Sequence, residues 1–517
     1  MTSSEKISIR IDGTTLEVDS GTQLAAALMG QGIFALRASP AGEDRGVLCA
    51  IGSCHECRAT VDGHRGVRTC LVTVQDGMKI DTERPLGRKL RAMARFSEEF
   101  EEEADVVVIG AGPAGLSAAC HAAELGQDVL VIDESPRSGG RIWAHRPPVP
   151  EVVRGWIDRA RRAGIRQLES TTVIDGEPGS LISASVIDGG RTRIRCARII
   201  VATGARERFL PFAGWTLPGV VGAGALQSLI KGGLDVRGKK IVVAGTGPLL
   251  LAVARLATTE GAEVILAEQA SITRRIPLLA SLLSSPARAR EAWRLWRSLR
   301  SIENRSSCWP VKAEGKQQVE RVHLKTPSGV RIESVDLLAV GFGLVPESRV
   351  AQGLGCQLAA DGSVEVDRYQ QTSVEGVLCA GEPTGVAGSE SALVSGQVAG
   401  IVAAGQTPPA ELLRRLRSHR RWGMALESAH QLRSEVVQLG SADDLICRCE
   451  DVSLSTVEGI ESLRQARMQC RIAMGPCQGR VCVPILSLRN GTEADSVRPP
   501  WSTCPSSSSD LSLTDGH

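Results

Sequence analysis

The chain contains 517 residues, of which 42% are hydrophobic and 23% are charged, and its formal net charge at pH 7 is +2. This length exceeds what one hydrophobic core can organise, so we expect several domains. The balanced charge gives no reason to expect a nucleic acid or a membrane surface as partner. No apolar run reaches spanning length, and residues 1–20 alternate polar and apolar side chains, unlike a signal peptide. We therefore expect a cytoplasmic protein with no transmembrane segment, peripheral to the inner membrane only through partners.

The 15 cysteines are not expected to form disulfide bonds in a reducing compartment. Eight of them fall into two tight groups, one near each end of the chain, and these eight are the candidate metal ligands. For the other seven, the simpler interpretation is a small buried side chain or an unused thiol. These seven are Cys120, Cys196, Cys308, Cys356, Cys379, Cys470 and Cys504.

The N-terminal region begins with a hairpin pattern. Residues 6–11 and 14–18 alternate polar and apolar side chains and are joined by Asp12-Gly13, which favours a tight β-turn. Residues 22–31 then predict a short helix. The region therefore starts as two paired strands followed by a helix.

Four cysteines follow with the spacing of an iron–sulfur loop. Cys49, Cys54 and Cys57 have the C-x4-C-x2-C spacing of plant-type [2Fe–2S] sites, and Cys70 is available as the fourth ligand. Gly52 and its small neighbours allow the backbone to curl and to point N–H groups at the sulfurs. Four thiolates also suit tetrahedral zinc, which stays open as the alternative. The order of hairpin, helix and cysteine loop resembles the β-grasp ferredoxin fold, and this resemblance implies an iron–sulfur cluster.

Two charged stretches predict helices. Residues 82–103 end in the acidic run Glu98–Glu103 and are expected to form a helical linker with a solvated charged face. Residues 272–302 predict an arginine-rich helix that either docks a partner or is simply solvated on its basic face. The side chains that define this second helix are Arg290, Arg294 and Arg297, with Trp293 and Trp296 nearby.

A dinucleotide-binding pattern begins at residue 105. Asp105 and the four apolar residues 106–109 predict a buried strand that runs directly into Gly110-x-Gly112-x-x-Gly115 and then into a helix. The first glycine allows a tight turn, the second lets a pyrophosphate approach the backbone, and the third brings helix and strand together. The helix N-terminus offers free N–H groups to the phosphates. Residues 127–132 predict the next strand, which ends at Asp133-Glu134, where an acid would bind a ribose hydroxyl.

Two further motifs fit a flavin site. Ser138-Gly139-Gly140-Arg141 follows the acidic strand end, at the place where two-dinucleotide flavoproteins have glycines beside the flavin. Residues 198–204 form an apolar strand ending in Thr203-Gly204, which matches the point where such proteins leave the FAD domain. Gly140, Arg141, Thr203 and Gly204 are therefore candidate cofactor-binding residues.

The same pattern of strand, glycine turn, helix, strand and acid is repeated further along the chain. Residues 239–244 predict a strand followed by Gly245-x-Gly247, a helix, a second strand and the acid Glu268. The interval from Gly245 to Glu268 equals that from Gly110 to Asp133, which indicates an internal repeat. Leu250 replaces the third glycine, so the helix is expected to lie further from its strand, and occupancy of the site stays open. Glu268 would repel a ribose 2′-phosphate, which favours NAD or another adenine nucleotide over NADP.

Residues 337–346 and 372–382 return to the first nucleotide-binding domain. The second of these is an apolar strand ending at Gly381-Glu382 and resembles the motif whose acid bonds the ribityl chain of FAD. The resulting order FAD–NAD–FAD resembles the pyridine nucleotide–disulfide reductase architecture, an α/β two-dinucleotide-binding flavoprotein fold. No Cys-x-x-Cys lies near the flavin region, so thiol–disulfide exchange is disfavoured.

A second cysteine group lies near the C-terminus. Cys447-x-Cys449 and Cys477-x4-Cys482 together resemble the [2Fe–2S] domain of the bacterioferritin-associated ferredoxin type. Cys470 is a competing candidate, but we favour Cys477 because its glycine-rich loop lets both cysteines turn toward one metal. Zinc is again the alternative.

The whole arrangement resembles a fusion of two subunits, the iron–sulfur and flavin subunits of the hydrogen cyanide synthase, opine oxidase and D-hydroxyproline dehydrogenase family. The sarcosine oxidase α subunit shares the layout of the first two parts, and residues 475–482 are the most specific segment of the resemblance. The resemblance implies FAD, two [2Fe–2S] clusters and a partner, an amino-acid-oxidase-like FAD subunit that oxidises the substrate. An FMN shared with that partner is a further option.

The expected domains follow these motifs. They are a [2Fe–2S] ferredoxin-like domain (1–90), a linker (91–103), a first FAD-binding part (104–215), an NAD(P)-like domain (216–330), a second FAD-binding part (331–410), a helical linker (411–442), a small helical [2Fe–2S] domain of the bacterioferritin-associated-ferredoxin type (443–490) and a disordered tail (491–517).

Three functions were compared on this basis. The favoured one is an electron-transfer subunit of a heteromeric amino- or imino-acid dehydrogenase, and the first alternative is a self-contained NAD(P)H-dependent reductase. A non-enzymatic zinc-bearing scaffold is the third. The sequence nominates no His or Arg pair as a substrate clamp, so it leaves the catalytic residues, substrate and electron acceptor unknown.

Overall fold

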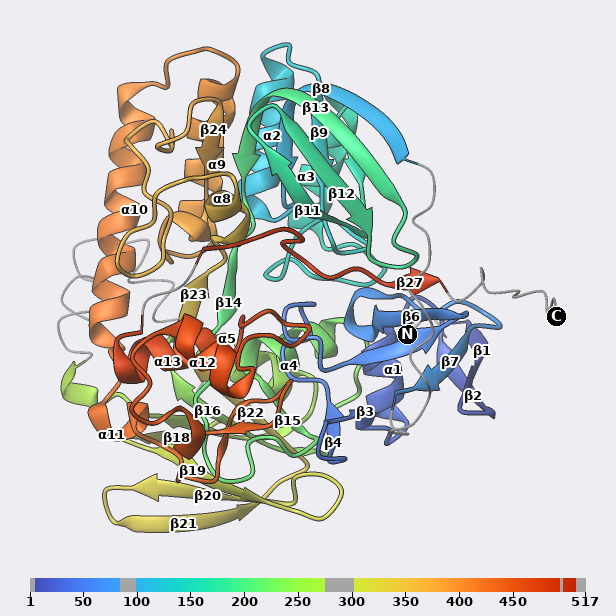
Figure 1. Cartoon of the computed structure of the whole chain (residues 1–517), viewed down its shortest axis with the longest axis vertical. Helices are drawn as coiled ribbons and strands as arrows, with labels where there is room; N and C mark the ends of the chain where they lie inside the picture. Colours follow the sequence, from blue (N-terminus) through green and yellow to red (C-terminus); the bar gives the residue numbers. More distant parts are fainter. Residues whose placement is uncertain (1–4, 84–98, 275–301, 493–495, 508–517) are drawn as a thin grey trace.

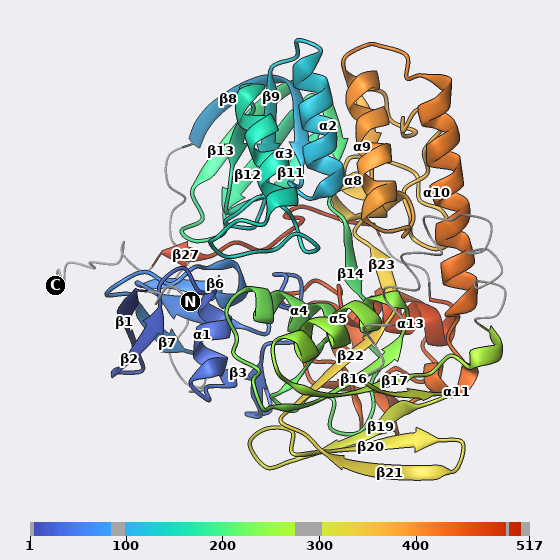
Figure 2. The ribbon, with the colours of Figure 1, turned by 180° about the vertical axis from the view of Figure 1, so that it is seen from behind.

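The computed structural model describes residues 5–83, 99–274, 302–492 and 496–507 (Figure 1). Two lobes lie one above the other in Figures 1 and 2. A two-stranded link, β14 (Ala205–Glu207) paired with β23 (Leu344–Pro346), runs between them. Among the described residues no helix is long and apolar enough to cross a membrane.

The N-terminal domain, in the lower lobe, is a mixed sheet with one helix against it. The order of its strands is β2-β1-β7-β5-β6-β27, and the predicted hairpin and helix are present at their expected places. The helix α1 is short and almost fully buried, because apolar residues occupy nearly every position. The elements are β1 (Lys6–Ile11), β2 (Thr14–Asp19), α1 (Leu24–Gly30), β3 (Ala35–Ala38), β4 (Asp44–Gly46), β5 (Arg58–Val61), β6 (His64–Arg68), a 3-10 turn η1 (Thr69–Leu71) and β7 (Lys79–Thr82).

The upper lobe is built on a sheet of order β10-β9-β8-β13-β12-β11, with β24 beside β13. Helices α2 and α9 pack together unusually closely, because a Cβ atom on Gly396 or Gly400 would overlap backbone carbonyls of α2. The elements are β8 (Glu99–Ile109), α2 (Pro113–Glu124), β9 (Val129–Ile132), α3 (Glu151–Arg162), β10 (Arg166–Leu168), β11 (Thr171–Glu177), β12 (Ser180–Ser185), β13 (Arg191–Val201), α8 (Arg349–Gly353), β24 (Val377–Cys379), η2 (Glu382–Thr384) and α9 (Ser389–Ala403).

The helical linker predicted at 82–103 is wrong at every residue that the structure describes: Thr82 ends β7, and Glu83 forms an isolated β-bridge with Arg37. Residues 99–103 form the first half of β8 and pair in parallel with β13. The physical reason is charge: Glu101 lies 3.5 Å from Arg195 on the neighbouring strand β13, and Glu102 lies 2.5 Å from Arg166 on β10. Opposite charges on neighbouring strands stabilise the pairing that the isolated acidic run would resist. The rest of the predicted linker, from residue 84 to 98, lies outside the described residues.

The lower lobe contains the second nucleotide-binding sheet, of order β15-β22-β16-β17-β18, and an antiparallel sheet β19-β20-β21. Helices α4 and α5 cover the nucleotide-binding sheet on the side seen in Figure 2. The elements are β15 (Val220–Gly222), α4 (Ala223–Lys231), β16 (Lys240–Thr246), α5 (Pro248–Thr259), β17 (Glu263–Glu268), β18 (Glu303–Ser306), β19 (Trp309–Glu314), β20 (Arg321–Thr326), β21 (Gly329–Ser334) and β22 (Leu337–Phe342). The arginine and tryptophan residues of the basic helix predicted at 272–302 lie outside the described part of the chain.

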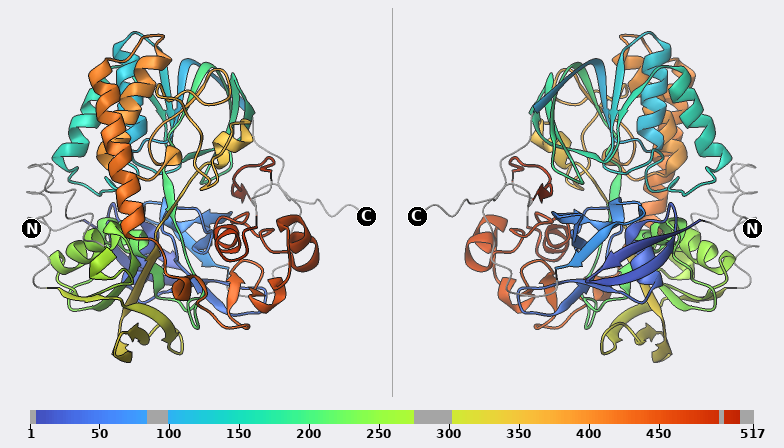
Figure 3. Two further views of the ribbon diagram at one scale, coloured as in Figure 1. Left: turned by 90° about the vertical axis from the view of Figure 1, so that its left-hand side faces the viewer. Right: turned by 90° about the vertical axis from the view of Figure 1, so that its right-hand side faces the viewer.

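The C-terminal region forms a small helical domain beside the N-terminal one (Figure 3). Its elements are α11 (Ser434–Val437), β25 (Leu445–Cys447), β26 (Val452–Ser453), η3 (Ser455–Val457), α12 (Leu463–Cys470) and α13 (Cys482–Asn490). The helix before it, α10 (Ala410–Ala429), packs against α9 of the upper lobe, and the strand after it, β27 (Ser506–Ser507), joins the N-terminal sheet.

The disordered tail predicted at 491–517 is wrong for residues 496–507, which run back across the molecule. Trp501 is 1% exposed, and β27 pairs antiparallel with β6 of the N-terminal domain. The buried indole, the pairing with β6 and hydrogen bonds from Gln478 and Arg480 hold a segment whose proline and serine content indicated disorder. Residues 493–495 and 508–517 are not among those described.

Candidate functional site

A cavity of about 1190 Å³ lies between the two lobes, and both glycine motifs contribute to its wall. Its lining includes many of the residues predicted to bind cofactors, but not Gly115, Gly245, Glu268 or Gly381. The predicted residues found on the wall are Gly110, Gly112, Asp133, Glu134, Gly140, Arg141, Thr203, Gly204, Gly247 and Glu382. The structure therefore brings residues from 110 to 382 together around one space.

The first glycine motif has the geometry of a phosphate-binding turn. Gly110 has φ +107°, which L side chains rarely adopt, and a Cβ there would overlap the carbonyl of Ala202. Gly112 precedes α2 with φ −74°, and the nearest atom to an added Cβ would be the Gly140 Cα at 3.9 Å. A Cβ on Gly115 would overlap the Gly110 carbonyl oxygen. Gly110 and Gly115 thus keep the turn tight, whereas Gly112 leaves the cavity wall without a side chain at this point.

Asp133 lies at the end of β9 and faces this turn. Its carboxylate accepts hydrogen bonds from the backbone N–H groups of Ala111 (2.5 Å) and Ser135 (2.7 Å). Burial raises the pKa of Asp133, and the two N–H groups act in the opposite direction. The acid is therefore held in a fixed position beside the glycine turn.

The remaining upper-lobe residues extend the same wall. A Cβ on Gly140 would stand 2.8 Å from the Gly112 Cα, so this crossing requires glycine at position 140. The Thr203 hydroxyl donates to the Glu347 carbonyl oxygen at 2.5 Å, and Glu347 N–H donates to the Gly204 carbonyl. Burial raises the pKa of Glu382, whose side chain borders the cavity. These residues extend the wall of the cavity, whose volume of about 1190 Å³ is large enough for an extended cofactor.

The second glycine motif repeats the arrangement. Glu268 accepts hydrogen bonds from the N–H groups of Gly247 (2.9 Å) and Ala270 (2.8 Å), as Asp133 does at the first motif. Gly245 has φ +135°, and a Cβ there would overlap the Gly341 carbonyl. Leu250 is 1% exposed and packs in the core, so its side chain is accommodated between helix and sheet.

The acidic end of this second motif is covered by the chain itself. The Thr246 hydroxyl, which also donates to Glu268, lies 3.4 Å from the His430 carbonyl. Gln269 donates to the Gln431 carbonyl at 3.1 Å and accepts from the Arg433 N–H at 3.2 Å. Residues 430–433, which follow α10, thus occupy the neighbourhood in which an adenosine ribose would approach Glu268.

The first cysteine quartet is fully buried, and its thiols contact each other in pairs. Cys49 contacts Cys54, and Cys57 contacts Cys70. Burial acts to raise the pKa of Cys49, but contact with Cys54 and with N–H groups of the loop lowers it to about 7. The N–H groups of Ile51 and Cys54 lie 3.5 and 3.3 Å from the Cys49 Sγ. N–H groups aimed at a sulfur stabilise a thiolate, the form that binds metals.

The second quartet has the same organisation. Cys447 contacts Cys482, and Cys449 contacts Cys477. Contact with Cys449 and N–H groups of the loop lower the pKa of Cys477 to about 6. Cys470 lies apart, with its thiol donating to the Ala466 carbonyl at 3.0 Å. The structure therefore assembles the two predicted quartets and leaves the competing cysteine inside a helical hydrogen bond.

Both cysteine loops border the cavity. Gly52 and Ser53 of the first loop line its wall, and the loop is held there by Arg141, which donates to the Ile51 carbonyl at 2.8 Å. Arg68 joins the Gly52 carbonyl (2.9 Å) to the carboxylate of Glu134 (3.2 Å). The predicted flavin residues Glu134 and Arg141 thus also fasten the first cysteine loop to the upper lobe.

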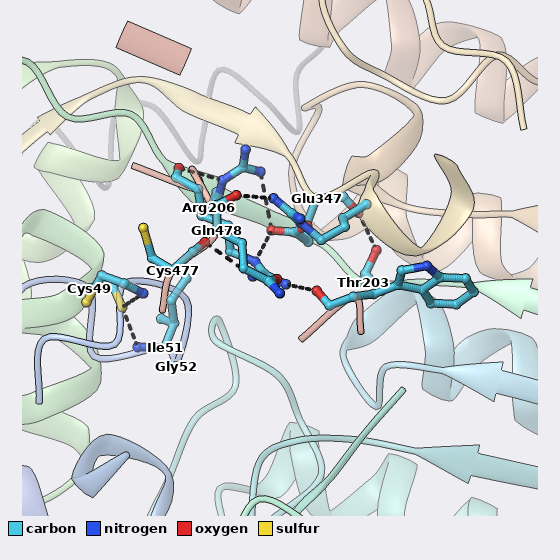
Figure 4. Close-up of polar contacts among 12 residues, drawn as sticks. Cys49, Ile51, Gly52, Thr203, Arg206, Glu347, Cys477 and Gln478 are labelled. Carbon is cyan, nitrogen blue, oxygen red and sulfur yellow. Dashed lines mark hydrogen bonds and ion pairs between the residues drawn. The ribbon is translucent and has the colours of Figure 1, made fainter. Parts of the chain in front are cut away.

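The second loop reaches the cavity through a group of charged residues that the sequence did not single out. Arg206 pairs with Glu347 at 3.2 Å and donates to the Arg480 carbonyl, while Arg349 donates to the Gln478 carbonyl at 2.6 Å (Figure 4). Burial acts to raise the pKa of Glu347, but the positive charges of Arg206, Arg480 and Arg349 lower it below its ordinary value. Burial and the charge of Arg480 lower the pKa of Arg349 to about 9.

Glu207 is a further residue at the cavity that the sequence did not single out. It is 8% exposed and accepts hydrogen bonds from the Gly224 and Ala225 N–H groups at the start of α4. Burial raises its pKa to about 8. A lone acid after Thr203-Gly204 carries no sequence signal, because its burial depends on the way the two lobes meet.

Comparisons with known proteins agree with this geometry. Residues 104–406 match the pyridine nucleotide-disulphide oxidoreductase family, and residues 4–85 match a 2Fe-2S iron-sulfur cluster binding domain. An opine oxidase subunit of Rhizobium meliloti (strain 1021) is 32% identical over 73% of this chain and 90% of its own length. Hydrogen cyanide synthase subunit HcnB of Pseudomonas aeruginosa is 29% identical over 74% of this chain and 92% of its own.

A solved structure resembles the whole chain. L-proline dehydrogenase from P. horikoshii has a TM-score of 0.71, with 97% of each chain covered and 21% identity. The chain is an FAD-dependent oxidoreductase with an iron–sulfur domain, and it belongs to the pyridine nucleotide-disulphide oxidoreductase family. Within that family it groups with hydrogen cyanide synthase subunit HcnB and the opine oxidase subunit, which confirms the family and the α/β fold expected from the motifs.

Proposed function

We propose that the chain is the electron-transfer subunit of a heteromeric dehydrogenase that oxidises the C–N bond of an amino or imino acid. The observation that carries the proposal is the cavity between the lobes, which is bordered by the first glycine motif and by both cysteine loops. Electrons that enter a flavin there have a short path to either quartet. The names of the relatives, which are subunits of an opine oxidase and of a hydrogen cyanide synthase, support a partner subunit. That partner is an amino-acid-oxidase-like FAD subunit.

The proposed FAD site uses the upper-lobe wall. The turn Gly110–Gly115 would hold the pyrophosphate, Asp133 the ribose, and Glu382 the ribityl chain, while Gly140 leaves room beside the flavin. A bound FAD accepts two electrons together and releases them one at a time. The protein residues supply its position and exclude water from the channel.

The pairing of the thiols supports [2Fe–2S] clusters over zinc at both quartets. Each iron of such a cluster takes two thiolates, and the cysteines here contact each other two by two. Zinc would need four ligands around one point. Among the described residues, no three His, Cys, Asp or Glu side chains converge on such a point.

The second nucleotide site supports the alternative function, a self-contained NAD(P)H reductase. Gly247 lines the same cavity as the first motif, so a nicotinamide could reach the flavin. Residues 430–433 oppose this, because they cover the region next to Glu268. We therefore assign this site to a tightly held NAD or other adenine nucleotide, or to no nucleotide, and not to a substrate. An FMN shared with the partner would then have to lie where the cavity opens toward that subunit.

Stopped-flow reduction of the purified chain decides between the two functions. NADH should bleach the flavin slowly or not at all, because the covered second site hinders exchange of nicotinamide. An amino or imino acid should bleach it only when the partner subunit is present. Fast reduction by NADH without a partner would refute the proposed function and establish the alternative.

A further inference from the structure

The two cysteine loops are joined by a buried group of charges that the proposed function does not use. Glu56 stands between the second and third cysteines of the N-terminal quartet, and Arg448 between the first two of the C-terminal quartet. Arg448 Nη2 lies 3.6 Å from Glu56 Oε2. Arg37 donates to Glu56 Oε1 at 3.0 Å and to the Arg448 carbonyl at 3.2 Å. We call Arg37, Glu56 and Arg448 the joint triad.

The joint triad is almost completely enclosed. Its three side chains are between 1% and 6% exposed. The Arg448 guanidinium stacks on the buried ring of Trp215, 4.9 Å from its centroid, and donates to the Trp215 carbonyl at 2.8 Å. Next to the triad, Arg45 binds Asp451 at 2.9 Å and makes a second ion pair between the same two domains. Burying these ions costs desolvation energy that their mutual attraction offsets only in part.

The charges of the triad indicate an anionic neighbour. Two guanidinium groups face one carboxylate, so the triad carries one net positive charge. The Nε atoms of Arg37 and Arg448, and the Oε2 atom of Glu56, have no hydrogen-bond partner in the described structure. Burying such atoms and a net charge without compensation is costly. Arg37 interacts electrostatically with Cys54 and with Cys449, one thiol from each quartet. A [2Fe–2S] cluster with four thiolates carries net negative charge, so a cluster on each side would compensate the net positive charge of the triad.

The apolar core shows which side of the first quartet faces the second. Cys49 and Cys54 belong to the same buried cluster of side chains as all four cysteines of the second quartet. Cys57 and Cys70 pack instead in the core of the N-terminal domain. The pair formed by Cys49 and Cys54 therefore lies toward the second quartet, with the joint triad at the contact.

We propose that the joint triad is the contact across which the two clusters exchange electrons, and that its charge sets the reduction potentials of both clusters together. This inference rests on the proposed function, since it requires a cluster at each quartet. In each step one electron leaves one cluster, which is oxidised by one unit, and enters the other, which is reduced by one unit. No bond is broken and no proton moves.

The test changes the charge of the triad by one unit in each direction. Glu56→Gln keeps the shape of the side chain and removes a negative charge, so the reduced form of both clusters should become more favourable. Arg37→Gln removes a positive charge and should disfavour it at both. In this poorly screened interior we expect at least a tenfold change in the ratio of reduced to oxidised cluster, or about 59 mV for a one-electron couple. Asp19→Asn, on the exposed hairpin of the same domain, is the matched control and should change neither potential.

The measurement is a redox titration followed by EPR, with iron content determined on each sample. Shifts of both potentials in opposite directions for the two variants, with mutual broadening of the two signals in the fully reduced protein, are the expected result. If both clusters are retained and one potential or neither moves, the inference is overturned while the proposed function stands. If the unmodified chain lacks one of the two signals, the proposed function itself fails. If Glu56→Gln does not fold, unchanged potentials in Arg37→Gln overturn the inference.

Discussion

Gly112 and Gly115 lie in the same turn, but an added Cβ atom on Gly112 makes only an ordinary contact with Gly140, whereas one on Gly115 overlaps a backbone oxygen. Gly112→Val should therefore leave the apoprotein folded and displace FAD, because the new side chain occupies the proposed pyrophosphate path. Gly115→Ala should instead destabilise the fold by about 3 kcal/mol through overpacking. Flavin absorbance and thermal unfolding of each variant measure the two effects separately. Full retention of FAD by Gly112→Val would contradict the assignment of the site.

Glu207 gives a prediction about pH. Its pKa is raised from an ordinary value of 4.5 to about 8, because it is buried. Between these values the folded state binds a proton that the unfolded state has released, so the free energy of unfolding falls as pH rises through this window. The contribution has a slope of about 1.4 kcal/mol per pH unit at most, and Glu207→Gln should remove it.

The protonation state of Glu207 can also be observed directly. Infrared spectra at neutral pH should contain a protonated-carboxyl band that disappears above pH 8 and is missing in Glu207→Gln. A negatively charged cluster at Cys49 would act on the pKa in the same direction as burial. A band that is unaffected by the substitution would assign the proton to another group.

Residues with a fixed local role were the ones that the sequence could predict. The glycines, Asp133 and the cysteines act through backbone geometry or ligand spacing, and both are properties of short segments. Glu207, Arg206 and Glu347 could not be found in this way. Their burial and partners are created by the contact between lobes, which no local pattern encodes.

At the scale of elements, strands and helices with a regular apolar pattern were predictable, as β1, α1, β9 and β16 illustrate. The first half of β8 was not, because its acidic residues pair with the arginines of β13, a strand far away in sequence. The segment 496–507 was not, because its order depends on Trp501 and on an edge strand supplied by the N-terminal domain. Long-range partners override local composition in both cases.

Trp501 allows the contribution of that segment to be measured. Its ring packs against Gly353, where a Cβ atom would overlap it, and its backbone N–H donates to the Ile174 carbonyl at 2.6 Å. Trp501→Ala should lower the free energy of unfolding by about 3 kcal/mol, since a large buried ring is removed. Met468→Ala, at a site 79% exposed, is the control and should have little effect. Denaturant titrations of both variants provide the comparison, and an equal loss in the two would refute the structural role of the segment.

At the scale of the whole molecule, the number of redox centres tests the architecture. Two quartets predict four irons per chain after anaerobic purification. Cys54→Ser and Cys477→Ser should each remove one EPR signal and leave the other, whereas Cys470→Ser should leave both, because its thiol is bonded within α12. Iron well below four atoms per chain, or loss of both signals in each variant, would contradict two independent sites.

The pairing of β27 with β6 also has a consequence for the order in which the molecule is made. During translation β6 is released long before residues 506–507, the segment that covers the outer edge of its sheet in the part of the chain that the structure describes. Until then β6 presents an open edge, a hazard for aggregation. Arg37 and Arg45 likewise lack their partners Arg448 and Asp451 until those residues have been synthesised. The iron–sulfur domain of residues 4–85 is thus completed only by segments synthesised much later, and we expect nascent chains to depend on chaperones that shield this edge during translation.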